Sequence, residues 1–114
     1  MTVLIYGNKS DCDNIIPMLD GKSRQCIAVD DFEELTVNLV NCSPDLVIVL
    51  QNGAKGMEGV YRARQYGADL PVFWFSDDKD FAIQSYRLKC NYFSPKPLTP
   101  QKLTLAFDRL KKLN

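Results

Sequence analysis

Short, almost wholly apolar runs recur along the chain and alternate with stretches of helical periodicity. Runs of this length without polar alternation are typical of strands that are buried on both faces of a sheet. The pattern predicts five strands, at residues 3–6, 26–29, 46–50, 72–75 and 91–93. The run at 46–50, LVIVL, is the most apolar, so we expect it at the centre of the sheet.

Between the strands, apolar residues spaced three or four apart predict five helices. We expect helices at residues 13–19 and 57–66, a helix capped by Asp30 or Asp31 that ends before Ser43, a helix capped by Asp77 or Asp78 that runs to about residue 88, and a last helix capped by Thr99. Asp and Thr are favoured caps because their side-chain oxygens accept hydrogen bonds from free backbone amides. In the helix at 57–66, Met57, Val60 and Tyr61 are spaced to face the sheet.

Strands that alternate with helices imply parallel βαβ units with right-handed crossovers. Five such units in 114 residues match a flavodoxin-like, doubly wound α/β fold, with a five-stranded parallel sheet of order 2-1-3-4-5 between two layers of helices. The length suits one domain over residues 1–114. Ligands of such folds bind beyond the carboxyl ends of the strands, so the segments to inspect are 7–13, 50–56, 76–78 and 94–97.

Composition and charge exclude several functions. The chain carries fourteen basic residues, fourteen acidic residues and no histidine. Without a basic excess we expect no direct binding of nucleic acid, and without histidine the commonest general base and metal ligand are absent. The sequence has no membrane-length apolar run and no signal peptide, so we expect a cytoplasmic protein that does not contact the membrane. Its four cysteines form no CxxC pair, and we expect reduced thiols rather than a disulfide or a metal site.

Two segments resemble bacterial response-regulator receiver domains, the CheY-like family. The sequence PDLVIVL at 44–50, followed by GMEG at 56–59, is similar to the third strand of that family and the loop after it. The sequences DFAIQSY at 80–86 and YFSPKPL at 92–98 are most similar to receivers that precede LytTR-type DNA-binding domains. The resemblance extends over essentially the whole chain, and its second half is the more specific part.

In that family an aspartate at the end of the third strand accepts a phosphoryl group, and an acidic pair after the first strand helps to hold Mg²⁺. Close carboxylates bind a hard cation, and the cation and a lysine neutralise charge on the transferring group. The resemblance places Ser76 at the position of the hydroxyl residue that ends the fourth strand. It places Lys96 at the position of the lysine that ends the fifth, and implies a cis Lys96–Pro97 bond.

The acidic residues that this chemistry requires are missing. The acceptor position falls on Leu50 when it is counted from the start of the strand, or on Gln51 when it is counted back from the glycines that follow. Neither side chain can accept a phosphoryl group. The acidic pair maps to Gly7 and Asn8, so we expect no metal site and no cofactor.

Two aspartates follow a few residues later, Asp11 and Asp13, and we expect them to cap the first helix rather than to act as ligands. Lys96 then has no acidic cluster to face, and we expect it to turn to solvent, to Gln51 or to a backbone carbonyl. We expect Ser76 to end its strand and cap the next helix. Contact of Lys96 with an anion, and a switch role for Ser76, stay open as alternatives.

The resemblance without the acceptor predicts an atypical receiver domain that is not an enzyme. It would act in signal transduction or transcriptional regulation by binding proteins, independently of aspartate phosphorylation. In the family, the fourth helix, fifth strand and fifth helix often form the face that binds a partner or a second copy. Here that face would include Gln84, Arg87, Lys89, Asn91, Tyr92 and Lys102.

Two other interpretations stay open. A small flavodoxin-like protein could bind a nucleotide or a flavin in a pocket lined by Tyr6, Asn8, Ser10, Ser76 and Lys96. The loop after the first strand has one glycine and one hydroxyl residue, which is little for a phosphate cradle. Alternatively, the chain could be the receiver portion of a longer regulator that continues into a DNA-binding domain.

Overall fold

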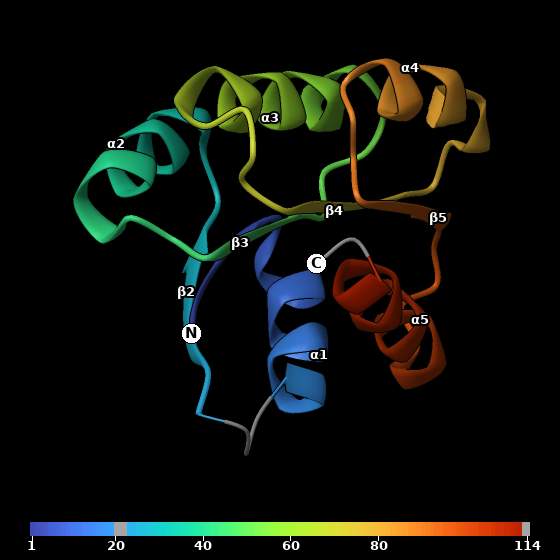
Figure 1. Ribbon diagram of the computed structural model, residues 1–114, viewed down its shortest axis with the longest axis horizontal. Coiled ribbons are helices and arrows are strands. Elements are labelled where there is room, and N and C mark those ends of the chain that lie inside the picture. Colours follow the sequence, from blue (N-terminus) through green and yellow to red (C-terminus); the bar gives the residue numbers. More distant parts are fainter. Residues whose placement is uncertain (20–22, 113–114) are drawn as a thin grey trace.

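The computed structural model describes residues 1–19 and 23–112, so residues 20–22 and 113–114 of the expected domain lie outside the described residues. Within that part of the chain a five-stranded parallel sheet has the order β2-β1-β3-β4-β5 (Figure 1). The strands are β1 Thr2–Tyr6, β2 Gln25–Val29, β3 Leu46–Val49, β4 Val72–Ser76 and β5 Tyr92–Pro95. The helices are α1 Lys9–Leu19, α2 Phe32–Cys42, α3 Gly53–Tyr66, α4 Ala82–Arg87 and α5 Pro100–Lys112, with a 3-10 turn at Lys79–Phe81.

The sheet lies between two layers of helices, as the alternation of strands and helices predicts. Helices α1 and α5 cover one face, and α2, α3 and α4 cover the other (Figure 1). Each face has its own apolar cluster, one around Ile5, Ile48 and Phe73 and the other around Leu4, Val47 and Trp74. The predicted flavodoxin-like fold and the central place of β3 are both confirmed.

Helix α1 begins at Lys9, four residues before the predicted start. The side-chain oxygen of Asn8 accepts a hydrogen bond from the backbone N–H of Asp11 at 2.8 Å, so Asn8 caps the helix. The prediction that Asp11 and Asp13 cap this helix is therefore wrong. Capping by Asn8 leaves the carboxylate of Asp11, in the first turn, free to make another contact.

The capping residues observed for the later helices agree better with those predicted from the sequence. Asp31 accepts from the backbone N–H of Glu34 at 2.7 Å, and Thr99 accepts from the backbone N–H of Lys102 at 3.2 Å. Asp78 accepts from a backbone N–H two residues on, but it caps the 3-10 turn rather than a full helix. The predicted single helix up to residue 88 is therefore divided into that turn and the short α4.

Helix α3 begins at Gly53, although a loop was predicted up to residue 56. A Cβ atom on Gly56 would lie 2.1 Å from the backbone oxygen of Gln51, which also accepts a hydrogen bond from the indole N–H of Trp74 at 3.0 Å. Because Gly56 has no side chain, the first turn of α3 can lie directly against this bond. The prediction that Tyr61 faces the sheet is wrong, since its side chain is 54% exposed.

Candidate functional site at the carboxyl edge of the sheet

Leu50, the first candidate for the acceptor position, is buried and packs against Gly7. Leu50 is 1% exposed, and its backbone N–H donates to the carbonyl oxygen of Tyr6 at 2.7 Å. A Cβ atom on Gly7 would lie 2.7 Å from the Cβ of Leu50, so Leu50 occupies the space where a side chain at position 7 would begin. The position counted as the acceptor and the first position of the acidic pair are therefore in direct, apolar contact.

Gln51, the second candidate, is also buried, at 8% exposed. Its side-chain amide donates to the backbone oxygen of Asp30 at 3.4 Å, so it turns toward the end of β2. Leu50, not Gln51, is the residue that adjoins Gly7. The amide of Gln51 contributes to packing between two loops and carries no charge.

Lys96 forms an ion pair with Asp11, with 2.7 Å between its Nζ and the carboxylate Oδ2. Their side chains are 11% and 24% exposed, so the pair is largely withdrawn from water. The prediction that Lys96 turns to solvent, to Gln51 or to a backbone carbonyl is wrong. Asp13, by contrast, pairs with Lys9 at 3.1 Å on an exposed surface.

Ser76 is fully buried and joins two loops instead of facing an open site. Its hydroxyl oxygen accepts hydrogen bonds from the backbone N–H of Gly53 at 3.2 Å and of Asp78 at 3.1 Å. Asn52 and Asp77 bridge the same two loops. The side-chain N–H of Asn52 donates to the carboxylate of Asp77, and the side-chain oxygen of Asn52 accepts from the backbone N–H of Asp77. The hydroxyl of Ser76 thus bonds to the start of α3 as well as to the segment before α4.

Hydrogen bonds from a residue of α5 stabilise the loop after β5. The Lys96–Pro97 bond is cis, as the resemblance implies. The ammonium group of Lys102 donates to the carbonyl oxygens of Pro95 at 2.6 Å and Pro97 at 2.8 Å. Lys102, which was predicted to face a partner, therefore lies across this loop.

The residues of the alternative nucleotide or flavin pocket lie in different environments. Tyr6 and Ser76 are fully buried, Asn8 caps α1, and Lys96 is paired with Asp11. Burial raises the pKa of Tyr6 above its ordinary value, and nearby carboxylates add to this. Within residues 1–19 and 23–112, no cluster of three or more Asp, Glu, Cys or His side chains could hold a metal ion.

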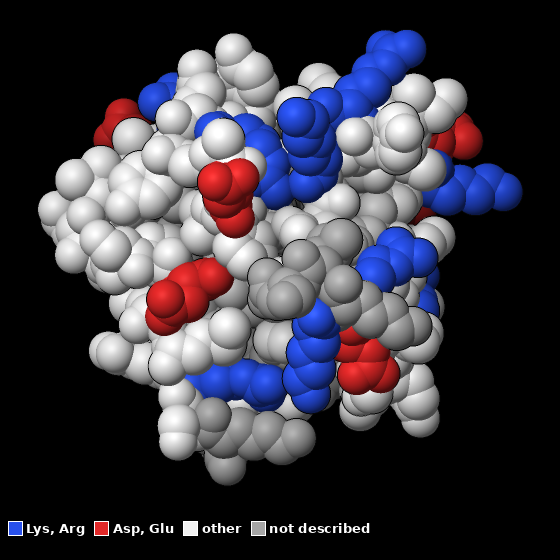
Figure 2. Space-filling model, in the orientation of Figure 1, with Lys and Arg blue, Asp and Glu red and all other residues white. Residues whose placement is uncertain are grey.

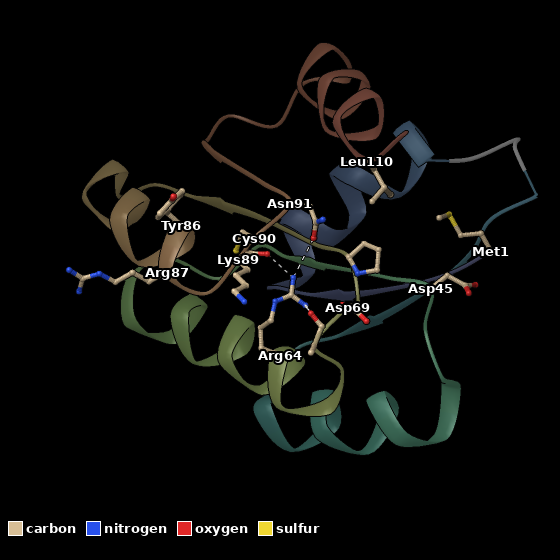
Figure 3. Close-up of a pocket in the computed structure, with 12 residues that line it drawn as sticks. Met1, Asp45, Arg64, Asp69, Tyr86, Arg87, Lys89, Cys90, Asn91 and Leu110 are labelled. Atoms are coloured by element: carbon tan, nitrogen blue, oxygen red, sulfur yellow. Dashed lines mark hydrogen bonds between the residues drawn. The ribbon is translucent and has the colours of Figure 1, made fainter. Parts of the chain in front are cut away.

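The opposite, amino edge of the sheet carries a hollow of about 980 Å³ between α3, α4 and α5 (Figure 3). Lys and Arg side chains gather over α3 and α4 in Figure 2. Arg64, one of the residues that line the hollow, stabilises the fold. Its guanidinium donates hydrogen bonds to the backbone oxygens of Leu70, Leu88 and Lys89. Burial lowers the pKa of Arg64.

The other predicted interface residues lie in different environments. Arg87 and Lys89 are exposed, whereas Gln84 is half-buried between α3 and α4. The side-chain oxygen of Asn91 accepts a hydrogen bond from the backbone N–H of Val72, the first residue of β4, at 2.9 Å. The ring of Tyr92 packs edge-on to that of Phe73, with 6.3 Å between centroids. The exposed residues of this set are therefore the two cations.

Among the described residues, no helix has both the length and the apolar character that crossing a membrane requires.

No protein-family model and no curated protein sequence matches the chain. Among solved structures, the N-terminal signal receiver domain of a two-component response regulator from Bacteroides fragilis is similar, with a TM-score of 0.81 at 23% identity over 95% of this chain and 94% of that one. A chemotaxis response regulator of Vibrio cholerae gives 0.81 at 16% identity, over 96% and 97%. The signal receiver domain of a modulated diguanylate cyclase from Desulfovibrio desulfuricans gives 0.78 at 21%, over 98% and 96%. The chain therefore has the fold of response-regulator receiver domains.

Proposed function

We propose that this chain is an atypical receiver domain that acts in signal transduction by binding a protein partner, without phosphorylation of an aspartate. The observation that carries the proposal is the contact between Leu50 and Gly7 at the carboxyl edge of the sheet. Phosphoryl transfer there would need a carboxylate nucleophile and a cation held by further carboxylates. A leucine side chain against a glycine supplies neither.

The ion pair of Lys96 supports the same proposal. In phosphoryl transfer, a free lysine ammonium would neutralise charge on the transferring group. Here Asp11 already lies 2.7 Å from that ammonium, so its charge is matched before any ligand arrives. A domain with this edge works by shape and binding rather than by catalysis.

The partner face that we propose lies on α4, β5 and α5. On α4 two exposed apolar residues, Ile83 and Tyr86, lie one helical turn apart, at 62% and 84% exposure. Arg87 and Lys89 add exposed positive charge beside them. An aromatic anchor surrounded by polar and charged groups is typical of protein interfaces. The resemblance to receivers that precede LytTR-type domains makes transcriptional regulation in the cytoplasm the output that we propose.

Incubation with acetyl phosphate and Mg²⁺, followed by intact-mass measurement, tests the central claim. We expect no added phosphoryl group, while a receiver domain that carries the acceptor aspartate gains one under the same conditions. A phosphoryl gain that disappears in an Asp11→Asn or Asp13→Asn variant would contradict the proposal. A second experiment tests the partner face by comparing how two variants bind the partner. Tyr86→Ser should abolish binding of the partner, and Val40→Ser, an exposed change on α2, should not.

A further inference from the structure

A groove of about 300 Å³ runs between α3 and α4, on the outer side of the helical layer. It is lined by Met57, Glu58, Tyr61, Gln84, Arg87 and Leu88. Met57 and Leu88 are half-buried and pack on the core beneath, so the floor of the groove is apolar. Tyr61 is 54% exposed. A space of this size is at the lower limit for small-molecule sites and suits one large side chain.

The polar residues of the groove lack partners within the described part of the chain. The side-chain oxygen of Gln84 is buried and accepts no hydrogen bond there. Glu58 and Arg87 are both exposed, and neither takes part in an ion pair among the described residues. A buried carbonyl oxygen without a donor is costly, which favours an arrangement in which the amide of Gln84 turns outward to a partner group.

The two charges lie at different heights along the groove. Helices α3 and α4 run in the same direction, since Phe81 contacts the start of α3 at Gly53, while the oxygen of Leu88 accepts from Arg64 near the end of α3. Glu58 is therefore nearer the carboxyl edge of the sheet, and Arg87, the last residue of α4, is nearer the amino edge. Figure 3 shows the side chain of Arg87 extending outward from α4.

We propose that this groove is a self-association site, in which two copies of the chain pair around a two-fold axis. A two-fold interface requires a self-complementary surface. The groove provides one, because Tyr61 of each copy can enter the apolar groove of the other while Glu58 of one lies opposite Arg87 of the other. A formal net charge of zero means that the copies do not repel each other at long range.

A second copy suits the groove better than a partner of one charge sign, because the groove carries one acid and one base. The proposal goes beyond the function proposed above, which does not require a dimer. The groove shares Arg87 with the proposed partner face, whereas Glu58 and Tyr61 on α3 lie outside that face. A protein that binds its partner as a monomer would leave the function intact and overturn only the present inference.

Sedimentation equilibrium of the full chain, from about 1 μM to about 1 mM, tests the proposal. We expect a reversible monomer–dimer equilibrium. Glu58→Lys or Arg87→Glu alone should raise the dimer dissociation constant at least about tenfold, since each places two pairs of like charges across the axis. The two reversed variants mixed in equal amounts should form a heterodimer, because every charge pair is then complementary again.

Charge changes of the same kind outside the groove serve as controls. Glu33→Lys on α2 and Lys111→Glu on α5 are exposed and should leave the dissociation constant unchanged. A chain that stays monomeric at the highest concentration would overturn the proposal. So would a dimer that neither single reversal weakens, or variants that fail to pair when mixed. Recovery on mixing also shows that the single variants are folded.

Discussion

The Asp11 carboxylate and the Lys96 ammonium are largely withdrawn from water, whereas Lys9 and Asp13, which lie two residues to either side of Asp11, are exposed. Exposed ion pairs contribute little to stability because water screens them and ordering their side chains costs entropy. A partly buried pair differs, because removal of one partner leaves a charge without a counter-charge in a poorly solvated place. The same helix therefore carries one ion pair that matters to the fold and one that hardly does.

Asp11→Asn should lower the free energy of unfolding by about 1–3 kcal/mol, since the buried ammonium of Lys96 loses a charged acceptor. Asp13→Asn, the same change two residues on, should alter it by less than about 0.5 kcal/mol. Urea unfolding followed by circular dichroism measures both. Equal effects of the two variants would show that the Lys96 pair adds nothing beyond a surface contact.

The sequence locates the candidate residues along the chain, but it does not predict their contacts. The positions of Leu50, Ser76 and Lys96 follow from short sequence segments, because each lies at the end of a strand or directly after it. Asp11 as the partner of Lys96 depends on which residue caps α1. Asn8 and Asp11 are both acceptable caps, so local sequence does not decide between them.

At the scale of elements, Arg64 ties the end of α3 to the turn before β4 and to the turn between α4 and β5. Lys89 in the second of these turns has a left-handed backbone, with φ of 57°, and its carbonyl oxygen accepts from Arg64 at 2.8 Å. A planar guanidinium can serve several oxygens at once, whereas an ammonium group on a flexible stem cannot hold the same geometry. Arg64 thus fixes where α3 ends and β5 begins.

Arg64→Lys should lower the free energy of unfolding by about 1–2 kcal/mol, because several carbonyl oxygens, most of them partly buried, lose their donors. The matched change Arg109→Lys affects an exposed residue that lies 5.5 Å over the ring of Tyr92, and should cost less than about 0.5 kcal/mol. Thermal and urea unfolding of the two variants give the comparison. Similar losses would mean that the bonds of Arg64 are replaced readily by water.

Element types could be predicted well and element boundaries less well. The apolar runs identify all five strands, because strands buried on both faces need continuous apolar sequence. The early start of α3 was missed, because it depends on Gly56 lying against Gln51 and Trp74, a contact between segments far apart in the sequence. The exposure of Tyr61 was missed for a related reason, since helical spacing does not fix the width of the buried face.

For the whole molecule, the order of the strands follows from the alternation of strands and helices and from crossover handedness, so the fold could be predicted. The protonation state of two cysteine thiols follows from their burial in that fold. Burial raises the pKa of Cys12 to about 11, with nearby carboxylates adding to the effect, and burial raises that of Cys90 to about 12. Both thiols therefore stay protonated in the folded chain at pH values where unfolded thiols ionise.

The free energy of unfolding should fall as the pH rises above the ordinary thiol value of 9.0. Protonated thiols are favoured by the folded state, so their contribution is complete below that pH and is lost progressively toward pH 11–12. Urea unfolding at pH 8 and pH 10.5 should differ by about 2 kcal/mol or more. A Cys12→Ala/Cys90→Ala variant should show a shallower slope, and an identical slope would contradict the assignment.

The contact between Gly7 and Leu50 also limits which sequences can be reached from this one. A carboxylic side chain introduced at position 7 alone would place its Cβ only 2.7 Å from the Cβ of Leu50. A carboxylate introduced at position 50 alone would stand among apolar side chains, where an isolated charge is disfavoured. Each first step toward an acceptor site thus weakens the fold before the second can help. Under the function proposed above, the packing of one leucine against one glycine therefore makes an acceptor site difficult to build one substitution at a time.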